Sequence, residues 1–300
     1  MKNSTYGFVD DGFRAAGQIF PTDKSRDLHR QALSSRNFRD TFLDEAEFRR
    51  APKFTGVNPR PGRNLLEKLD SEFIFGDERF QAEMAKVLGL RWRILDYKFV
   101  RGVPDEYLPA WVKEDCKGRF VANLGCYVRE QYRDFTYFRG IDFHQYIIDF
   151  PDRESDFITA YVYLDDVDSH CSPLYVLPKS HELGASVFPH KIEKDATGNF
   201  RYENDFGANS TYECLQLTGA AGSLYYWHAD TLHGTQPHED ERPRISVRIL
   251  AEKNSKSPSG CELDEANARL NGPLSLTRTR QDLDERGKAT MTGNIINKLI

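Results

Sequence analysis

Two histidines and one arginine have the residue types and spacing of an open metal site with an anion site beside it. His144 lies in the segment GIDFHQYIIDFP and His233 in YYWHADTLHGTQP, and both segments resemble strands and their ends. Ferrous iron in open sites is commonly bound by two imidazoles and one carboxylate on one face. Arg244 follows His233 by eleven residues, and its planar guanidinium suits a bidentate contact with a carboxylate. We therefore expect His144 and His233 to bind iron beside an anion site at Arg244.

The other histidines fit this chemistry less well. His228 lies five residues before His233, but only His233 is followed by Gly-Thr and by an arginine at the required distance. His181, in PKSH, is expected to order a turn. His29 is expected to be solvated on a charged helix. The loop residues are expected to be His170, His190 and His238.

The elements that must position these residues change in character along the chain. Before about residue 90 the pattern is helical: Asp77 can cap a helix through ERFQAEMAKVLG, which Gly89 can end. Residues 25–50 also carry apolar residues at roughly helical spacing. After Arg91 the chain consists of short β-branched and aromatic runs separated by Gly, Pro, Asp and Ser. These runs are WRILDYKFV, RFVANLGCYV, DFITAYVYL, PLYVLP, YECLQL, GSLYYWHA and RISVRIL.

Such runs without intervening helices predict a mainly β fold with helical additions, a jelly roll or related barrel. We expect one domain over 1–300, with a helical region at about 1–90 and a β-barrel core at about 91–252. A tail at about 253–300 is expected to pack outside the barrel. Residues 191–210 are polar and predict a long loop over one mouth of the barrel.

Charge and cysteine content limit the classes of partner. The net charge of −5 and the pI near 5.9 give no general attraction to nucleic acid or to an anionic membrane. No run of apolar residues is long enough to span a bilayer, and the first residues do not resemble a signal peptide. Five scattered cysteines without a C-x-x-C pair favour free thiols. We expect a soluble, cytoplasmic protein that is a monomer or homodimer.

Several further motifs accompany the proposed ligands in a fixed order. Gln145 follows His144, and Pro151 precedes the run DFITAYVYLDDV. Later in the chain come LYVLPKSH, then His233-Gly-Thr, and then Arg244. This order and spacing resemble the phytanoyl-CoA dioxygenase family of Fe(II)- and 2-oxoglutarate-dependent oxygenases. The resemblance covers roughly residues 120–250.

The resemblance implies a double-stranded β-helix, an Fe(II) cofactor, 2-oxoglutarate as cosubstrate, and oxygen with a small-molecule substrate. It places the distal carboxylate of 2-oxoglutarate on Arg244 and Ser246, and it makes Tyr161 an aromatic residue that lines the cosubstrate site. Thr159, on the same strand face as Tyr161, and Thr235 complete the expected cosubstrate-binding set. The residues expected near the substrate are Arg129 and Gln131, alternating inward with Tyr127 on a strand before His144, and Trp227. Arg242 and Arg248 are expected to be surface or salt-bridging groups.

Position 146 departs from the family. Where the family has its iron-binding aspartate, two residues after the first histidine, this chain has Tyr146. Three interpretations remain open: a weakened or inactive site, whether natural or introduced; a carboxylate supplied by Asp149, although an odd offset would put it on the opposite strand face; or a variant site that uses another ligand such as the phenolate. The bulk of tyrosine disfavours the halogenating variants of this site, which have a small residue there.

The expected reaction is oxidation of an unactivated C–H bond, by hydroxylation and alternatively by desaturation or cyclisation. The substrate is expected to be a small biosynthetic molecule. Tyr146 favours a second hypothesis, a metal-poor or non-catalytic barrel that binds a small molecule. A third, a cupin-like isomerase or hydrolase with another metal, is disfavoured by the spacing of Arg244.

Overall fold

The fold was obtained as a computed structural model that describes residues 6–34, 40–50, 56–235, 241–242, 244–283 and 291. Its centre is one strongly curved sheet with the strand order β1-β11-β5-β13-β2-β4-β12-β6-β10, and β3 pairs with β4 at the side. The bounds are β1 Phe13–Gln18, β2 Arg93–Gly102, β3 Val121–Asn123, β4 Thr136–His144, β5 Phe157–Tyr163, β6 Leu174–Val176, β10 Leu215–Leu217, β11 Ser223–His228, β12 His233–Thr235 and β13 Arg244–Glu252.

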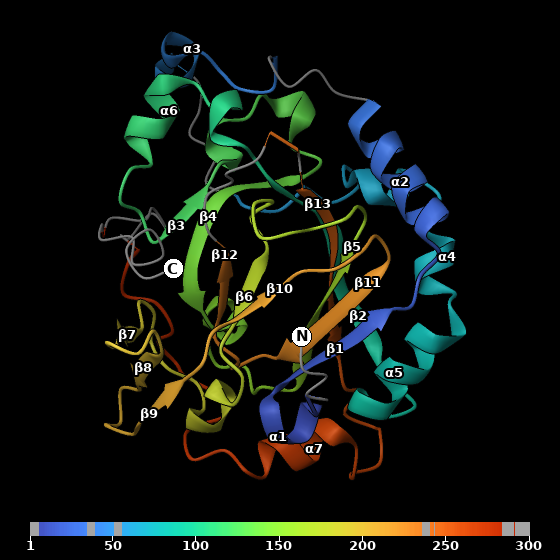
Figure 1. Ribbon diagram of the computed structural model, residues 1–300, viewed down its shortest axis with the longest axis vertical. Helices are drawn as coiled ribbons and strands as arrows, with labels where there is room; N and C mark the ends of the chain where they lie inside the picture. The colour runs from blue at the N-terminus through green and yellow to red at the C-terminus, as the bar shows by residue number, and fades with distance from the viewer. Residues whose placement is uncertain are drawn as a thin grey trace.

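The sheet curls so that two groups of strands face each other across an interior (Figure 1). Strands β3, β4, β12 and β6 form one wall, and β2, β13, β5, β11 and β1 form the other. Where pairing is antiparallel, as in β13 with β5 and with β2, alternate residues face the interior. The expected double-stranded β-helix is confirmed by this arrangement.

Helices cover the outer face of the second wall (Figure 1). Helix α5 contributes Phe80 and Met84 to a core shared with Val162 and Val247, which point outward from β5 and β13. Asp77 caps α5 by accepting hydrogen bonds from the backbone N–H groups of Arg79 and Phe80, as the sequence predicted. The helices are α1 Phe8–Asp11, α2 Thr22–Ser34, α3 Glu45–Arg50, α4 Glu72–Phe75, α5 Glu78–Leu88, α6 Ala110–Asp115 and α7 Glu262–Asn267.

Short 3-10 helices connect many of the strands. Two of them matter for the site: η5, which follows the first turns after β3, and η6, which begins directly after β4. The bounds are η2 Leu65–Lys68, η3 Asp105–Tyr107, η4 Gly125–Tyr127, η5 Glu130–Tyr132, η6 Tyr146–Asp149 and η7 Ser180–Leu183.

Three elements differ from the sequence prediction. The N-terminal region contains β1, which pairs with β11 and adds a strand to the barrel. The expected strand RFVANLGCYV is a strand only over Val121–Asn123, because the chain then turns through η4. The expected loop at 191–210 is a three-stranded antiparallel sheet, since its alternating apolar residues pack with Phe143 and Leu177. This small sheet comprises β7 Lys191–Lys194, β8 Phe200–Glu203 and β9 Asn209–Tyr212.

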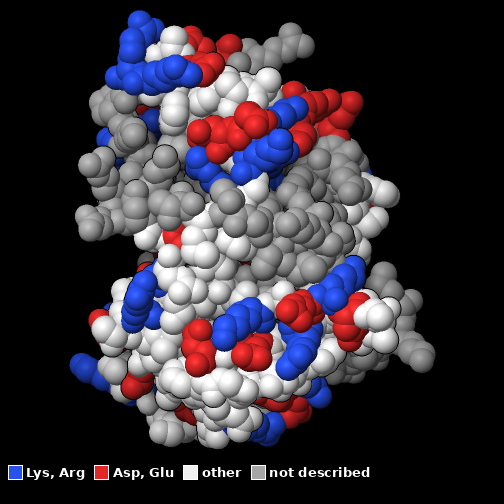
Figure 2. Space-filling view, turned by 90° about the vertical axis from the view of Figure 1, so that its left-hand side faces the viewer, with Lys and Arg blue, Asp and Glu red and all other residues white. Residues whose placement is uncertain are grey.

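The surface and the cysteines agree with the composition. Figure 2 shows basic and acidic side chains interspersed on one face of the molecule, with no large area of a single charge. All five cysteines are free thiols. Within the described ranges, no helix combines the length and the apolar character needed to cross a membrane.

Candidate active site

The two predicted histidines lie directly opposite each other at one end of the barrel. His144 is the last residue of β4 and His233 the first of β12, and the two are partners in the antiparallel pairing of these strands. Directly opposed strand residues hold their side chains close together on one face. Accordingly, the two ring centroids are 4.2 Å apart, a separation that allows both imidazoles to bind one ion.

Each imidazole is fixed in the same way by the backbone. His144 Nδ1 lies 2.9 Å from the carbonyl oxygen of Asp142, and His233 Nδ1 lies 2.9 Å from that of Thr231. A carbonyl can only accept, so each Nδ1 carries the proton and each Nε2 keeps its lone pair. This is the usual orientation of metal-binding histidines. Among the described residues, the buried Nε2 of His233 has no hydrogen-bond partner, as expected of an atom that binds a metal.

Burial keeps both rings neutral. Removal from water lowers the pKa of His144, and burial together with the neighbouring His144 lowers the pKa of His233 well below its usual value. Only a neutral imidazole can donate a lone pair to a cation. The pair is therefore ready to bind metal without first losing protons.

Gln145 holds the turn that follows β4. Its side-chain amide donates to the carbonyls of Gly184 and Asp230 at 2.8 and 2.9 Å, and its carbonyl accepts from the backbone N–H of Ser186 at 2.8 Å. The chain cannot continue as a strand beyond His144, because these bonds direct it into η6. The family-like His-Gln pair thus consists of one ligand candidate and one residue that positions the next turn.

Arg244, at the start of β13, points into the same cavity as the histidines. The cavity has a volume of about 540 Å³ and is lined by His144, His233, Thr235 and Arg244. The guanidinium is buried; Nη1 donates to the carbonyl of Ser172 and, at 3.4 Å, to Thr235 Oγ1. Within the described part of the chain its Nε has no partner. A buried cation with a free donor is a suitable anchor for a carboxylate.

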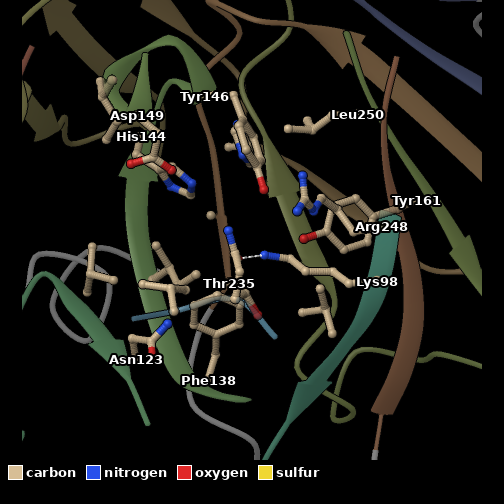
Figure 3. Close-up of a pocket in the computed structure, with 18 of the residues that line it drawn as sticks. Lys98, Asn123, Phe138, His144, Tyr146, Asp149, Tyr161, Thr235, Arg248 and Leu250 are labelled. Atoms are coloured by element: carbon tan, nitrogen blue, oxygen red, sulfur yellow. Dashed lines mark hydrogen bonds between the residues drawn. The ribbon is translucent and has the colours of Figure 1, made fainter. Parts of the chain in front are cut away.

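Tyr146 enters this cavity, although by a different route from the one predicted. It is the first residue of η6 rather than a strand residue. Its ring nevertheless stacks on His233, with centroids 5.6 Å apart and planes 3° from parallel, and lies 6.2 Å from His144 (Figure 3). Burial raises the pKa of Tyr146, so the phenol is neutral at ordinary pH unless a metal removes its proton.

Asp149 also lines the cavity, and the prediction that it faces away was wrong. Strand alternation ends at His144, and the η6 turn brings the Asp149 carboxylate beside the His144 ring (Figure 3). The carboxylate is exposed and pairs at 3.5 Å with Arg280. Nevertheless, in the part of the chain that the structure covers, no three His, Cys, Asp or Glu side chains come together closely enough to hold a metal.

The histidine pair thus fits iron, whereas a third protein ligand is not in place. The fit rests on the two Nε2 lone pairs. The misfit rests on position 146, where a neutral phenol occupies the space beside His233. Iron held by two imidazoles alone has more open positions and weaker retention than iron held by two imidazoles and a carboxylate.

The remaining predicted cosubstrate residues fall into two groups. Tyr161 and Thr235 line the cavity with Arg244. Thr159 and Ser246 face the barrel interior from β5 and β13, but they are fully buried and do not reach the cavity wall. Their hydroxyl oxygens have no hydrogen-bond partner within the described ranges. Thr159 and Ser246 are therefore buried on the interior face of the sheet without lining the cavity.

The residues proposed to face the substrate do not do so. Arg129 and Gln131 lie in and beside η5, because the chain turns after β3; Arg129 pairs with Glu47 at 2.6 Å and Gln131 is exposed. Trp227 is fully buried, stacks on Tyr161 at 5.3 Å and lies 4.9 Å from His233. It packs behind the site and does not line the cavity.

Three cations that line the cavity were missed: Lys98, Arg248 and Arg280. Lys98 on β2 and Arg248 on β13 are both buried and face each other across the paired strands. Arg248, predicted to be a surface or salt-bridging group, forms an ion pair with Asp96 but is only 1% exposed. Its place could have been found in the sequence, since it lies four residues beyond Arg244 and therefore on the same strand face.

The other histidines that the structure describes do not line the cavity. His228 is buried and its Nε2 bonds Asn267 Oδ1 at 2.8 Å, which supports the choice of His233. His29 is buried, against the prediction of a solvated residue, whereas His190 lies in a loop, as predicted, and is buried there. His181 is buried in η7, in the predicted turn. His238 lies outside the described residues.

Comparison with known proteins bears on the family and on the fold. Residues 132–246 match the model of the family described as phytanoyl-CoA dioxygenase. No curated protein matches the sequence. Among solved structures, the chain resembles the epimerase SnoN in complex with Fe3+, alpha ketoglutarate and nogalamycin RO: identity is 14%, coverage 96% of this chain and 91% of that chain, and the TM-score 0.50. EvdO2 from Micromonospora carbonacea var. aurantiaca is 16% identical, with coverage of 85% and 91% and a TM-score of 0.51. At sequence identities this low, the structural similarity shows a shared fold.

Proposed function

Since the chain belongs to the phytanoyl-CoA dioxygenase-like family of iron- and 2-oxoglutarate-dependent oxygenases, we propose that it oxidises an unactivated C–H bond of a small molecule. His144 and His233 bind Fe(II), and Arg244 binds the distal carboxylate of 2-oxoglutarate. Hydroxylation is the default outcome, and desaturation or cyclisation are the variants. A biosynthetic substrate is favoured because SnoN, of the same fold, was crystallised with nogalamycin RO.

One observation carries the proposal: two imidazoles with free Nε2 atoms and one buried guanidinium line the same cavity. A buried guanidinium without a full set of partners costs several kcal/mol unless an anion joins it. The two imidazoles can bind a metal ion, and the guanidinium can bind the far carboxylate of a diacid that chelates this metal. This assignment explains both groups better than a purely structural role does.

Each residue has a separate task in the reaction. Iron with 2-oxoglutarate and oxygen supplies the oxidising equivalent, and the keto acid leaves as succinate and carbon dioxide. Arg244 orients the diacid through its distal carboxylate. The backbone carbonyls of Asp142 and Thr231 hold the Nδ1 protons, which leaves the Nε2 lone pairs of the two adjacent rings for the metal. Tyr161, which lines the cavity, and Trp227, which stacks on it, exclude water from the wall next to His233.

The direct test is release of succinate. The purified chain, given Fe(II), oxygen and 2-oxoglutarate, is expected to form succinate above the level of a metal-free sample. The rate is expected to be low, because a phenol replaces the usual carboxylate and because no primary substrate is present. Succinate formation that is equal in the His144→Ala/His233→Ala double variant would contradict the proposal.

A second function is favoured by Tyr146 alone: a barrel that binds a small molecule but turns over little or no 2-oxoglutarate. The neutral, stacked phenol beside His233 is the observation for it. The two functions differ in metal dependence. Binding of 2-oxoglutarate that is equally tight with and without Fe(II), with no succinate formed, would establish the second.

A further inference from the structure

Lys98 and Arg248 form a second cationic centre in the cavity. Both side chains are at least nine-tenths buried, at 4% and 1% exposure, and both line the cavity. They are opposed residues on the paired strands β2 and β13. Figure 3 shows Arg248 directed toward the hydroxyl of Tyr146, and Lys98 extended toward the middle of the cavity.

The hydrogen bonds of these two residues leave donors available. Lys98 donates to the amide oxygen of Asn58, a neutral partner. Arg248 donates through Nη2 to Asp96, while its Nε and Nη1 have no partner within the described residues. A buried guanidinium with two unused donors lacks acceptors that a ligand can supply.

This centre is separate from the anchor at Arg244. Four residues separate Arg248 from Arg244 on one strand, and a strand rises about 3.3 Å per residue, so their Cα atoms are about 13 Å apart. The two guanidinium groups also have different partners, since Arg244 donates to Ser172 and Thr235 whereas Arg248 donates to Asp96. With the distal carboxylate of 2-oxoglutarate on Arg244, the centre at Arg248 and Lys98 is open to a different anion.

The charges around the centre indicate how much negative charge is missing. Asp96 compensates Arg248, and Asp149 pairs with Arg280, which also pairs with Asp282. Lys98 is the cation in this group whose only hydrogen-bond partner among the described residues is neutral. Burial, with Arg248 nearby, lowers the pKa of Lys98 well below its usual value, and an anion beside Lys98 would offset this by favouring its protonated form. Lys98 and Arg248 together have one carboxylate partner, Asp96, among the described residues. One added negative charge would therefore balance this pair, and a dianion would exceed what is needed.

We propose that Lys98 and Arg248 bind a carboxylate of the primary substrate, so that the substrate class is small organic acids with a single negative charge. This inference rests on the proposed function, because it assigns Arg244 to the cosubstrate. The aromatic and aliphatic residues of the cavity, among them Phe138 and Leu250, contact the rest of the molecule. Lys98 and Arg248 determine specificity and hold the reacting carbon at a fixed distance from the metal-binding end.

The test compares acids with uncharged analogues of the same size. The protein is loaded with Mn(II) and 2-oxoglutarate without oxygen, and calorimetry measures binding of hexanoate against hexanamide and phenylacetate against phenylacetamide. Each carboxylate is expected to bind about tenfold or more tightly than its amide, a difference of about 1.4 kcal/mol. Equal binding of acids and amides, or tighter binding of hexyl phosphate than of hexanoate, would overturn the proposal.

Three variants locate the effect. Lys98→Met is expected to bring the acid-to-amide ratio to about one. Asn58→Asp places a built-in carboxylate on Lys98 and is expected to abolish the preference without leaving a buried charge uncompensated. It therefore keeps the test valid if Lys98→Met does not fold. Lys191→Met, an exposed strand lysine paired with Glu203 outside the barrel, is the matched control and should keep the preference. An unchanged preference in Asn58→Asp would contradict the assignment.

Binding of 2-oxoglutarate in the same variants separates the two proposals. Its affinity is expected to stay within about threefold of the original in Lys98→Met and Asn58→Asp, a change of less than 1 kcal/mol. A parallel loss of 2-oxoglutarate binding would mean that the centre serves the cosubstrate, which overturns the inference but not the proposed function. Selective acid binding that depends on Lys98, without succinate formation, would support the inference and count against the proposed function.

Discussion

The two walls of the cavity differ in the charge of the groups they present. On the wall of β4 and β12 the groups at the proposed metal position are neutral: His144 and His233, with Tyr146 just beyond. The carboxylate of Asp149, in the same turn as Tyr146, is paired with Arg280. On the wall of β2 and β13 they are cationic: Lys98, Arg244 and Arg248. A metal ion needs lone pairs, and an anionic ligand needs charged donors, so the two tasks are on opposite sides of one space.

The difference arises from local hydrogen bonds rather than from burial alone, because both walls are largely buried. Each imidazole donates to the carbonyl two residues before it, which fixes the tautomer. The guanidinium groups instead keep donors that nothing in the described chain accepts. The first wall is complete except for a metal and an anionic ligand, and the second wall is complete except for anions.

The largest effect is expected from breaking the neutral wall. His233→Ala removes one of the two lone-pair donors and should weaken Fe(II) binding by about 100-fold or more, since even loss of a residue behind a ligand costs 10–100-fold. An anaerobic iron titration measures this. Exposed His170 provides the control, and His170→Ala should bind iron as the original chain does. Equal iron binding in the His233→Ala and original chains would remove His233 from the metal site.

Breaking the cationic wall should leave iron in place. Arg244→Met removes the proposed anchor and should weaken 2-oxoglutarate binding by about 2–5 kcal/mol, roughly 30-fold or more, with iron affinity mostly retained. Calorimetry with iron-loaded protein measures both constants. Arg242→Met, an exposed arginine two residues earlier that pairs with Asp168, is the matched control. Equal loss of iron and 2-oxoglutarate would make Arg244 a structural residue.

Tyr146→Asp sharpens the comparison, because it adds a carboxylate at the position two residues after His144, whereas the existing carboxylate of Asp149 is paired with Arg280. Iron occupancy and coupled product formation are expected to rise by about an order of magnitude, or about 1.4 kcal/mol in binding. Tyr146→Phe keeps the ring stacked on His233 and removes only the hydroxyl. A fully active original chain that the aspartate does not improve, together with lost iron binding in Tyr146→Phe, would identify the phenolate as a native ligand.

Site residues on strands could be predicted from the sequence better than site residues in the turns that follow the strands. His144, His233 and Arg244 were predicted because their residue types and their spacing can be recognised in the sequence. The structure brings all three to one cavity. Asp149 was misplaced because strand alternation was extended past His144, where Gln145 directs the chain into η6. Spacing rules hold only as far as the element that produces them.

The other incorrect or missing predictions also have physical explanations. Arg129 and Gln131 were placed on a strand that ends at Asn123, and no pattern in their type reveals the turn. The sheet β7–β9 carries polar residues on its outer face, and its alternation of Ile192, Phe200 and Tyr202 inward is short. Lys98 was missed because burial of a lysine depends on partners distant in sequence, here Asn58.

A further effect is expected at Asp230, on the dependence of folding stability on pH. Burial raises the pKa of Asp230 to about 8, and its side chain accepts one hydrogen bond, from Ser155 at 2.7 Å. A carboxyl group with a raised folded-state pKa stabilises the fold fully only below its unfolded pKa of about 3.9, and this stability is lost as the pH rises through about 8.

Asp230→Asn should remove that dependence. In urea unfolding of the metal-free protein, the variant should gain stability relative to the original between pH 4 and pH 8, on the order of 1–3 kcal/mol. Ser155→Ala, which removes the hydroxyl donor but not the carboxyl, should retain the pH dependence. Identical pH profiles for Asp230→Asn and the original chain would show that Asp230 does not carry an unusual proton.

The central claim is that the neutral wall binds the metal while the cationic wall binds the anions. Crystals grown without oxygen in Fe(II) and 2-oxoglutarate, with anomalous diffraction at the iron edge, test it most directly. The account predicts one iron peak between Nε2 of His144 and Nε2 of His233, and 2-oxoglutarate with its distal carboxylate on Arg244. An iron peak away from the histidine pair, or 2-oxoglutarate whose distal carboxylate lies on Lys98 and Arg248, would contradict it.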